Sequence, residues 1–219
     1  MNNEEINTAP AEVKESFNLK KEVFEWFYTI IIAIAIAFVI KTFLFDFVVV
    51  DGPSMHPTLV HGDRLIITKL NYKPESQDII VLDSSYKNRN AYYDDLGGLN
   101  PVEKFIEYFS LPAGLKHKYY VKRVIGMPGQ VVDIIDNKVY VDGKPLDESG
   151  YYNGETFEYD SNVSFPFTVS EGSVFVMGDN RPQSKDSRSS DLGEVPMEAI
   201  LGKCVFRLFP FDSIGVLKH

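Results

Sequence analysis

The chain has 219 residues and a formal net charge of −9 at pH 7. Nucleic-acid-binding domains normally carry a basic patch or stripe, and no block of Lys or Arg is present, so we expect no nucleic-acid partner. The single cysteine, Cys204, excludes an intramolecular disulfide and lies in a strand-like apolar run, which indicates a small buried side chain rather than a catalytic thiol. The histidines lack the spacing of metal ligands, so the sequence predicts no metal and no other cofactor.

The segment 23–45 is a candidate membrane span. The run from Trp26 to Ile40 contains no charged residue, and the whole segment is close to the ~20 residues that cross a bilayer. Lys41 lies near one end, where its side chain can reach the interface. We therefore expect residues 1–22 to form a cytoplasmic tail and residues 23–45 to form a transmembrane signal-anchor.

A cleaved signal peptide and a buried core helix are the alternatives to an anchor. The small residues Ala33, Ala35 and Ala37 fit a cleavage site, but further apolar residues follow them, which favours an uncleaved anchor. A core helix should have a polar face. More lysines precede the segment than closely follow it, which favours a single span with a cytoplasmic N-terminus and an extracytoplasmic C-terminal domain in the cell membrane.

Beyond the span the sequence is typical of a β domain. Short apolar and β-branched runs alternate with turn signals rich in Gly, Pro, Asn and Asp. These runs lie at residues 47–50, 64–70, 78–82, 119–125, 131–135, 138–141, 173–177 and 203–209. Many short strands with regular turns predict a mainly β core, a barrel or a sandwich, over residues 46–215.

Residues 84–118 interrupt this β pattern with a long polar stretch. Asn100 and Pro101 suit the N-cap and the first position of a short helix over 100–109. The apolar residues of this helix recur at i, i+3, i+4 and i+7 and share one face, formed by Val102, Phe105, Ile106 and Phe109. We expect this face to pack on the β core, as such stripes usually do. Contact with the membrane surface or with the rim of a substrate cleft is the alternative.

Three motifs contain the candidate chemistry: GPSMHPTL at 52–59, YYVKRVIG at 119–126 and GDNRPQSKDSR at 178–188. Taken alone, each is ambiguous. Ser54 can be a nucleophile on a rigid turn or an ordinary turn serine. Lys122 in an apolar strand usually points to solvent, and a buried lysine requires an explanation because an unpaired buried ammonium is very costly.

Together, and in this order, the three motifs resemble those of bacterial type I signal peptidases, which are Ser–Lys serine proteases. The resemblance covers about residues 46–83 and 118–215. It implies a signal-peptidase-like β catalytic core with a small β cap subdomain, here roughly residues 137–170. It also implies a membrane-bound endopeptidase whose partners are the lipid bilayer and the preproteins from which it removes N-terminal signal peptides after small residues.

The resemblance assigns catalytic roles residue by residue. Ser54 matches the nucleophile, and Lys122 matches the general base. Ser184 matches the serine that orients the base. Asp186 and Arg188 match a charged pair that supports the site.

The resemblance also implies the substrate contacts and the oxyanion hole. Met55 and Tyr120 are expected to contact the substrate. Gly52 stands where some family members have a serine whose side chain contributes to the oxyanion hole, although glycine also occurs there, especially in Gram-positive members. The hole is then expected to rely on backbone N–H groups, with Ser54 and Gly52 as the candidates. The segment 84–118 is longer than the family leads us to expect.

Three rival functions remain open at this point. A self-cleaving repressor uses Ser–Lys chemistry, but it is soluble and carries a DNA-binding domain. A Ser-His-Asp hydrolase would need His56 or His117 to reach Ser54, and the sequence contains no G-x-S-x-G elbow. A catalytically inactive membrane-anchored binding or assembly module is the third, although Lys122 and Ser184 are both present with Ser54.

Overall fold

The computed structural model of the chain describes residues 19–70, 72–160 and 162–217. Most of the tail predicted for residues 1–22 therefore lies outside the described residues. The chain divides into two compact units, residues 1–40 and residues 41–219, and each is described by itself.

The first unit contains one long apolar helix, α1 (Leu19–Val39). Its segment Glu22–Val39 is long and apolar enough to cross a membrane, and none of this segment is buried within the protein. The chain then forms a π-helical turn, η1 (Ile40–Leu44), and becomes extended at Phe45. The α-helical part therefore ends at Val39, and the π-helical turn covers most of the remainder of the predicted segment 23–45.

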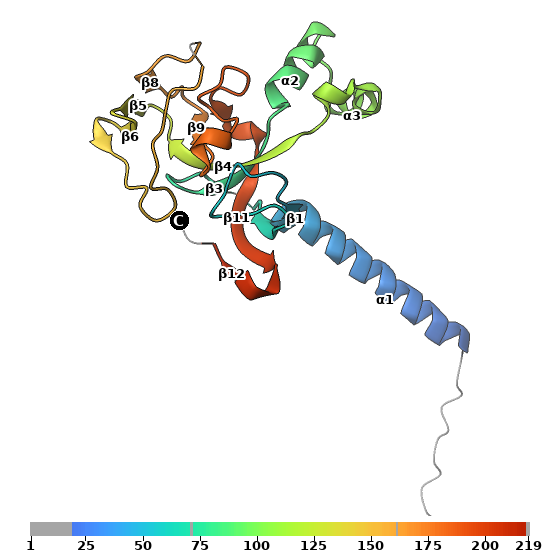
Figure 1. Ribbon diagram of the computed structural model, residues 1–219. Helices are drawn as coiled ribbons and strands as arrows, with labels where there is room; N and C mark the ends of the chain where they lie inside the picture. Colours follow the sequence, from blue (N-terminus) through green and yellow to red (C-terminus); the bar gives the residue numbers. More distant parts are fainter. Residues whose placement is uncertain (1–18, 71, 161, 218–219) are drawn as a thin grey trace, which may run out of the picture. The chain divides into compact units, whose positions relative to one another are not determined.

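The second unit is built on an eight-stranded antiparallel sheet (Figure 1). Its strands follow the order β1-β2-β11-β3-β4-β9-β10, and β12 pairs with β11. Their bounds are β1 (Phe45–Val49), β2 (Arg64–Thr68), β3 (Ile79–Asp83), β4 (Tyr119–Gly126), β9 (Ser173–Met177), β10 (Val195–Pro196), β11 (Ile200–Phe209) and β12 (Gly215–Val216). Every residue of β3 and of β9 is buried, which explains their continuous apolar sequences.

A second, four-stranded sheet has the order β7-β6-β5-β8. Its strands are β5 (Val131–Ile135), β6 (Lys138–Val141), β7 (Lys144–Pro145) and β8 (Phe167–Thr168). Asp136 and Asn137 join β5 to β6 with positive φ angles of 49° and 60°, the conformation of a tight hairpin turn. The mainly β fold predicted from the sequence is confirmed. The cap subdomain was expected to begin at about residue 137. The second sheet begins earlier, at Val131, because β5 is the hairpin partner of β6.

A shared apolar cluster joins the two sheets. It contains Ile125, Val132, Val139, Val169, Phe175 and Met177, all buried. Phe175 of β9 is central to it, because its ring lies 5.2 Å from that of Phe167 in β8 and 6.0 Å from that of Phe165. Two further clusters lie within the larger sheet and around its neighbouring loops.

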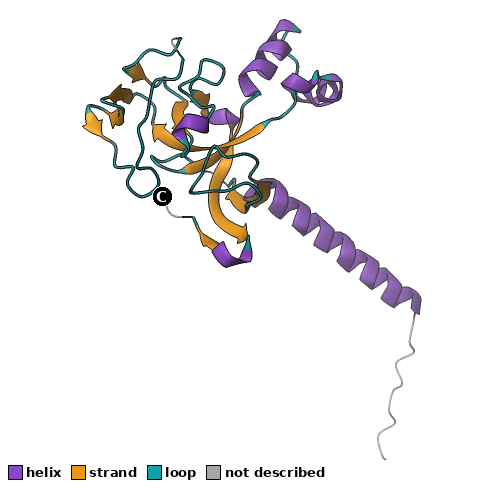
Figure 2. Ribbon diagram, viewed as in Figure 1, coloured by secondary structure: helices purple, strands orange, loops and turns teal. Residues whose placement is uncertain are grey.

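Two helices form the segment between β3 and β4 (Figure 2). The predicted helix is present as α3 (Pro101–Ser110), with Asn100 and Glu103 in a capping box. The preceding helix, α2 (Tyr86–Asp95), was not predicted, because its sequence is rich in Asn, Tyr and Asp and has no apolar period. The remaining helical turns are short: η2 (Ala113–Leu115), η3 (Arg181–Gln183), η4 (Met197–Ala199) and η5 (Phe211–Ser213).

The expectation that α3 packs its apolar face on the β core is wrong. No residue of α3 is buried, and its four apolar residues are all exposed. The polar side of the helix faces α2 instead, since Glu107 accepts a hydrogen bond from the Tyr92 hydroxyl at 3.0 Å.

Replacing the central aromatic residue of the inter-sheet cluster tests whether that cluster holds the two sheets together. We expect Phe175→Ala to lower the free energy of unfolding by about 3–5 kcal/mol, because a fully buried ring is removed and a cavity remains. The matched control is Phe211→Ala, which removes an exposed ring and should change stability little. Denaturant unfolding of the full chain in detergent measures both, and equal effects of the two substitutions would contradict the assignment.

Candidate active site

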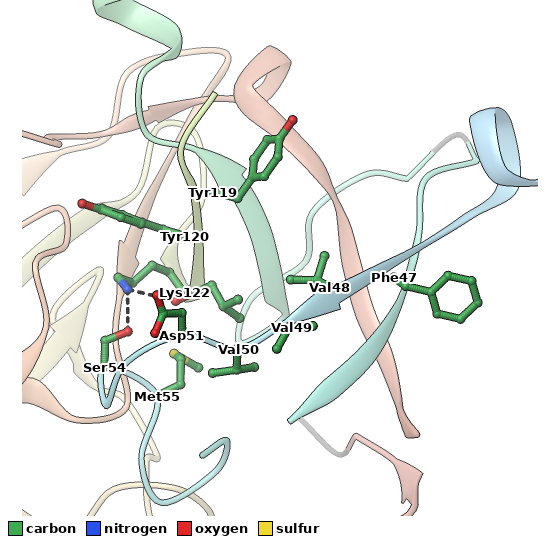
Figure 3. A pocket seen from close by; sticks show the side chains of 11 residues that line it. Phe47, Val48, Val49, Val50, Asp51, Ser54, Met55, Tyr119, Tyr120 and Lys122 are labelled. Carbon is green, nitrogen blue, oxygen red and sulfur yellow. Dashed lines mark hydrogen bonds between the residues drawn. The ribbon is translucent and has the colours of Figure 1, made fainter. Parts of the chain in front are cut away.

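Ser54 and Lys122 lie side by side, although 68 positions separate them in the sequence (Figure 3). Ser54 occupies the turn that follows β1, and Lys122 lies in the middle of β4. The Lys122 Nζ is 2.9 Å from the Ser54 Oγ, and it also donates a hydrogen bond to the Val121 carbonyl oxygen at 2.9 Å. This distance allows a proton to pass between the hydroxyl and the amine.

The Lys122 amine is almost removed from solvent. Its side chain is only 3% exposed, so it does not point to solvent as a lysine in a strand usually does. Burial disfavours the charged form and lowers the pKa of Lys122 from 10.5 to about 8, although the negative charges of Asp186 and Asp179 act in the opposite direction. A large fraction of the amine is therefore neutral in mildly alkaline solution.

The third motif holds the turn that contains Ser54. Asn180 donates two hydrogen bonds to this turn, from its backbone N–H to the Ser54 carbonyl oxygen at 3.0 Å and from its side-chain amide to the Pro53 carbonyl oxygen at 3.1 Å. Gly178 makes this approach feasible, since a Cβ at that position would lie 2.4 Å from the Ser54 carbonyl oxygen and 2.2 Å from the Ser184 Oγ. A side chain at position 178 would thus separate the two motifs.

Ser184 is buried next to this contact. Its Oγ has no hydrogen-bond partner within residues 19–70, 72–160 and 162–217. A buried hydroxyl without a partner is costly and requires a reason, which function can supply. No hydrogen bond joins Ser184 to Lys122, whose amine bonds Ser54 and Val121 within the same residues.

The backbone near Ser54 offers a free donor for an oxyanion. The Gly52 N–H donates to the His61 Nδ1 at 3.3 Å, so it is already engaged. The Ser54 N–H has no hydrogen-bond partner among the residues that the structure describes. Gly52 has a φ of +90°, a conformation that other L-residues adopt only with strain, so glycine is favoured there by the backbone and not by lack of space.

Asp186 and Arg188 form a buried ion pair beside the site. Arg188 binds both carboxylate oxygens of Asp186 at 2.9 Å, and the same carboxylate accepts a hydrogen bond from the Gly178 N–H at 3.0 Å. Arg188 also donates to the Arg181 carbonyl oxygen at 2.7 Å. The pair therefore fixes the loop that carries Gly178 and Asn180.

Two more buried arginines, Arg123 and Arg181, support the site. Arg123, next to Lys122, binds both oxygens of Asp179 at 2.8 and 2.7 Å, and the Thr58 hydroxyl donates to the same carboxylate. Arg181 donates to Glu148 and Thr156, which precede β8 in the chain. All of these arginines and Asp179 lie inside quoted motifs, but no sequence pattern indicates with which residues they pair.

A pocket of about 260 Å³ opens beside Ser54 and Lys122 (Figure 3). Residues 47–51 and 119–122 line it, together with Met55, so that β1 and β4 form its two walls. Met55 is buried, and Tyr120 lies with its ring centroid 5.1 Å from the Lys122 Nζ. This volume is enough to hold a substrate side chain.

Neither His56 nor His117 is bonded to Ser54 among the described residues. His117 contacts Asp83 through its Nδ1 at 2.6 Å, and His56 is exposed. Lys122 is the partner of the Ser54 hydroxyl among the described residues. Within the same residues, no group of three or more His, Cys, Asp or Glu side chains is placed to hold a metal ion.

Comparison with known proteins finds relatives along nearly the whole chain. Residues 23–209 match the sequence model of a family described as signal peptidase, peptidase S26. A signal peptidase I from Bacillus licheniformis is 35% identical over 211 residues, covering 92% of this chain and 96% of that protein. Signal peptidase I from Bacillus amyloliquefaciens is 33% identical over the full length of both chains, and signal peptidase IB from Staphylococcus aureus is 32% identical over 92% of this chain and 95% of its own.

The solved structures include a crystal structure of a signal peptidase I from Enterococcus faecalis V583. It is 28% identical in sequence and covers 60% of this chain and 97% of its own, with a TM-score of 0.39. This score is too low for the likeness to support an argument about the fold.

Neutralising Asp186 tests whether the buried ion pair supports the site. We expect Asp186→Asn to lower the free energy of unfolding by about 3–5 kcal/mol, because it leaves Arg188 buried without a counter-charge. Asp191→Asn is the matched control, since Asp191 pairs with Lys185 at the exposed surface. The free energy of unfolding of this variant should be nearly unchanged. Denaturant unfolding in detergent compares the two, and a negligible loss in Asp186→Asn would contradict the supporting role.

Proposed function

The chain belongs to the signal peptidase family, peptidase S26, and removes signal peptides as a membrane serine peptidase; within that activity we propose that Ser54 is the nucleophile and Lys122 its general base. One observation carries the assignment, the 2.9 Å contact between the Ser54 Oγ and a lysine amine that is buried. The Ser–Lys pair is a known variant of the catalytic triad.

The neutral amine is the active form of Lys122. A neutral amine has two N–H groups and one lone pair, so it can donate one hydrogen bond to the Val121 carbonyl oxygen while the lone pair accepts the Ser54 O–H. The protonated amine has no lone pair and cannot accept that proton. The lowered pKa of Lys122 therefore supports its role as base.

The reaction proceeds through an acyl-enzyme. The Ser54 Oγ attacks the carbonyl carbon of the scissile bond as its proton passes to the Lys122 Nζ, and the protonated amine then gives that proton to the leaving amino group. A water molecule attacks the resulting ester while Lys122 accepts one of its protons. Collapse of the second tetrahedral intermediate releases the new carboxyl end and returns the proton to Ser54.

The Ser54 N–H is the proposed donor to the oxyanion. It is free among the described residues, whereas the Gly52 N–H is bonded to His61, and only a movement of His61 would release it. One such donor typically contributes ~2.7–4 kcal/mol to transition-state stabilisation. The Asn180 side-chain amide bonds the Pro53 carbonyl oxygen, which belongs to the same peptide plane as the Ser54 N–H, so the free N–H has a fixed direction.

Ser184 is proposed as a positioning residue for the base. A protonated Lys122 has a third N–H group beyond those directed at Ser54 and Val121. The unpartnered Ser184 Oγ, close to Gly178 and to the Ser54 carbonyl oxygen, is a suitable acceptor for it once the amine is charged. The Asp186–Arg188 pair acts indirectly, through the backbone of Gly178.

The substrate is proposed to bind in extended form along β1. This strand is at the end of the larger sheet, so one of its edges can pair with an added strand. The pocket between β1 and β4 then receives a small side chain next to the scissile bond, with Met55 and Tyr120 as contacts. Signal peptides are cleaved after small residues, which is the reason for proposing a small side chain at this place.

The proposed location follows from α1 and from the charge pattern. α1, the one candidate span among the described residues, is proposed as the anchor, with the N-terminus in the cytoplasm and residues 46–215 outside it, so the partners are signal-peptide-bearing preproteins and the lipid bilayer. No nucleic-acid partner is proposed, because the chain carries a net negative charge. The inactive binding module that the sequence left open has no support, and the 2.9 Å contact between Ser54 and Lys122 argues against it.

Single substitutions test the two catalytic assignments. We expect Ser54→Ala and Lys122→Ala each to lower kcat by at least about 10³-fold, because the pair acts as a unit. Cleavage of a preprotein with an A-x-A site by the full chain in detergent measures this. Ser190→Ala and Lys185→Ala, which change exposed residues near the third motif, are the matched controls and should keep full activity. A folded Lys122→Ala variant with near-normal activity would show that another group is the base.

The pH dependence of the reaction tests the burial of the base. The neutral fraction of Lys122 is about one half at pH 8 if its pKa is about 8, but only roughly 0.3% if the pKa keeps the ordinary value of 10.5. We expect kcat/KM to rise with pH, to reach half its maximum near pH 8 and to level off well below pH 10.5. Near-ultraviolet spectra over the same range control for unfolding. A rate that is still rising at pH 10 in the folded enzyme would contradict a buried, neutral base.

A further inference from the structure

The apolar face of α3 has no cover among the described residues. Its four residues, Val102, Phe105, Ile106 and Phe109, are 67%, 66%, 64% and 68% exposed. They follow one another at helical spacing, so they form one continuous stripe along the helix. A continuous apolar patch of this kind on a well-formed helix indicates a contact surface.

The opposite side of α3 is fixed to α2, which holds the stripe outward. Glu107 bonds the Tyr92 hydroxyl, and the Lys104 Nζ lies 5.4 Å from the centroid of the Tyr93 ring. The helix ends at Ser110, and its C-cap residue Leu111 is buried. The stripe therefore cannot be covered by a rotation of α3 that leaves these contacts intact.

The helical pair itself is attached to the larger sheet by buried charges. Asp83, the last residue of β3, binds Arg89 of α2 and His117, which precedes β4. Its other carboxylate oxygen accepts the Ser85 N–H at 3.0 Å. Figure 1 shows α2 and α3 next to one another beyond the ends of β3 and β4. The exposed stripe thus belongs to a rigid element rather than to a loose loop.

Charge and aromatic content indicate what covers the stripe. The chain is acidic as a whole, yet the residues exposed just after α3 include Lys116 and Lys118. Apolar aromatic side chains on one face are typical of helices that lie in a membrane interface, where they enter the lipid, and the exposed lysines that follow α3 can meet anionic headgroups.

The chain is also tethered at a bilayer. Only the five-residue turn η1 separates α1 from β1, and five residues span less than roughly 20 Å even when fully extended. A lipid surface is therefore always close to the second unit. A second copy of the chain is a weaker candidate, because a stable protein interface takes about 20–30 residues a side and this stripe has four.

We propose that α3 is an interfacial helix whose Val102–Phe105–Ile106–Phe109 face binds the surface of the lipid bilayer. The proposal rests on the membrane anchoring proposed above, but not on the roles of Ser54 and Lys122. A ladder of rings joins the helix to the site, since Tyr108 lies 5.0 Å from His117, which stacks on Tyr119 at 5.6 Å. Tyr119 lines the pocket, so a helix seated on lipid fixes the height of the pocket above the membrane.

Depth-dependent fluorescence quenching on the full chain tests the proposal. The chain is reconstituted in phosphatidylethanolamine–phosphatidylglycerol vesicles whose acyl chains are brominated. An environment-sensitive dye is attached at Ile106→Cys on the apolar face or at Asp94→Cys, an exposed position on α2 that serves as control. The native Cys204 is buried, which raises the pKa of its thiol to about 12, so it should remain unlabelled, and the unsubstituted chain checks this.

We expect the emission of the dye at position 106 to be shifted to the blue and quenched by the brominated acyl chains. The emission of the dye at position 94 should show neither effect. Absence of quenching at position 106 would overturn the proposal. A blue shift without quenching that grows with the protein-to-lipid ratio would also overturn it, because it would identify a second copy as the occupant.

A variant of the face itself links binding to function. Phe105→Glu/Phe109→Glu changes only exposed side chains and is expected to abolish quenching of the dye at position 106 and to slow preprotein cleavage in vesicles. Cleavage of a short soluble peptide in detergent should stay unchanged in this variant. The control is Ile135→Glu, which changes an exposed residue of β5 and should alter neither the quenching nor the cleavage of the preprotein or of the peptide. Quenching that survives in the double variant would overturn the proposal. Ser54→Ala separates the two proposals, since it should stop cleavage and leave quenching intact.

Discussion

The burial of one lysine amine next to one serine hydroxyl is the constraint on which the rest of the structure depends. Lys122 works as a base only without its charge, and a low-polarity surrounding achieves this by making the charge costly. Two carboxylates stand close enough to oppose the effect, Asp186 and Asp179. Each of them is bound through both oxygens by a buried arginine, Arg188 and Arg123. These arginines offset the negative charges that would otherwise hold the proton on the amine, so the ion pairs serve the chemistry as well as the fold.

The proposed nucleophile depends on the same loop. Gly178 donates a hydrogen bond from its N–H to Asp186 on one side and allows Ser54 and Ser184 to approach on the other. Since Asn180 holds the Ser54 carbonyl group, a change in the Asp186–Arg188 pair reaches the nucleophile through three consecutive backbone positions. The first and third motifs, more than 120 residues apart in the chain, thus form a single rigid unit around the reacting hydroxyl.

The sequence was sufficient to predict most of the strands and the candidate catalytic pair, but not the contacts that surround them. The strands, the β5–β6 hairpin and the helix at α3 follow from local patterns, and the roles proposed for Ser54 and Lys122 follow from the family resemblance that the motifs carry in combination. The partners of Arg123 could not be predicted, because its pairing with Asp179 requires β4 to lie beside β9 with Arg123 opposite Met177, and no local signal sets that register. Helical spacing likewise showed which residues of α3 share a face but not what that face meets. The prediction of a core contact was wrong because Asp83 and Arg89 hold the helical pair outside the core.

The same lysine connects activity with stability. Its pKa is about 8 in the folded protein and near 10.5 in an unfolded chain, so between these two values the unfolded state binds more protons and stability rises with pH. Below about pH 8 both states are protonated, and the folded protein then contains a charged amine that is almost fully buried. The difference of roughly 2.5 units corresponds to a cost on the order of 3 kcal/mol, a large part of the stability of an ordinary domain. The inter-sheet cluster around Phe175 and the buried arginine pairs must offset it, which explains why so many tightly bound groups surround a single catalytic amine.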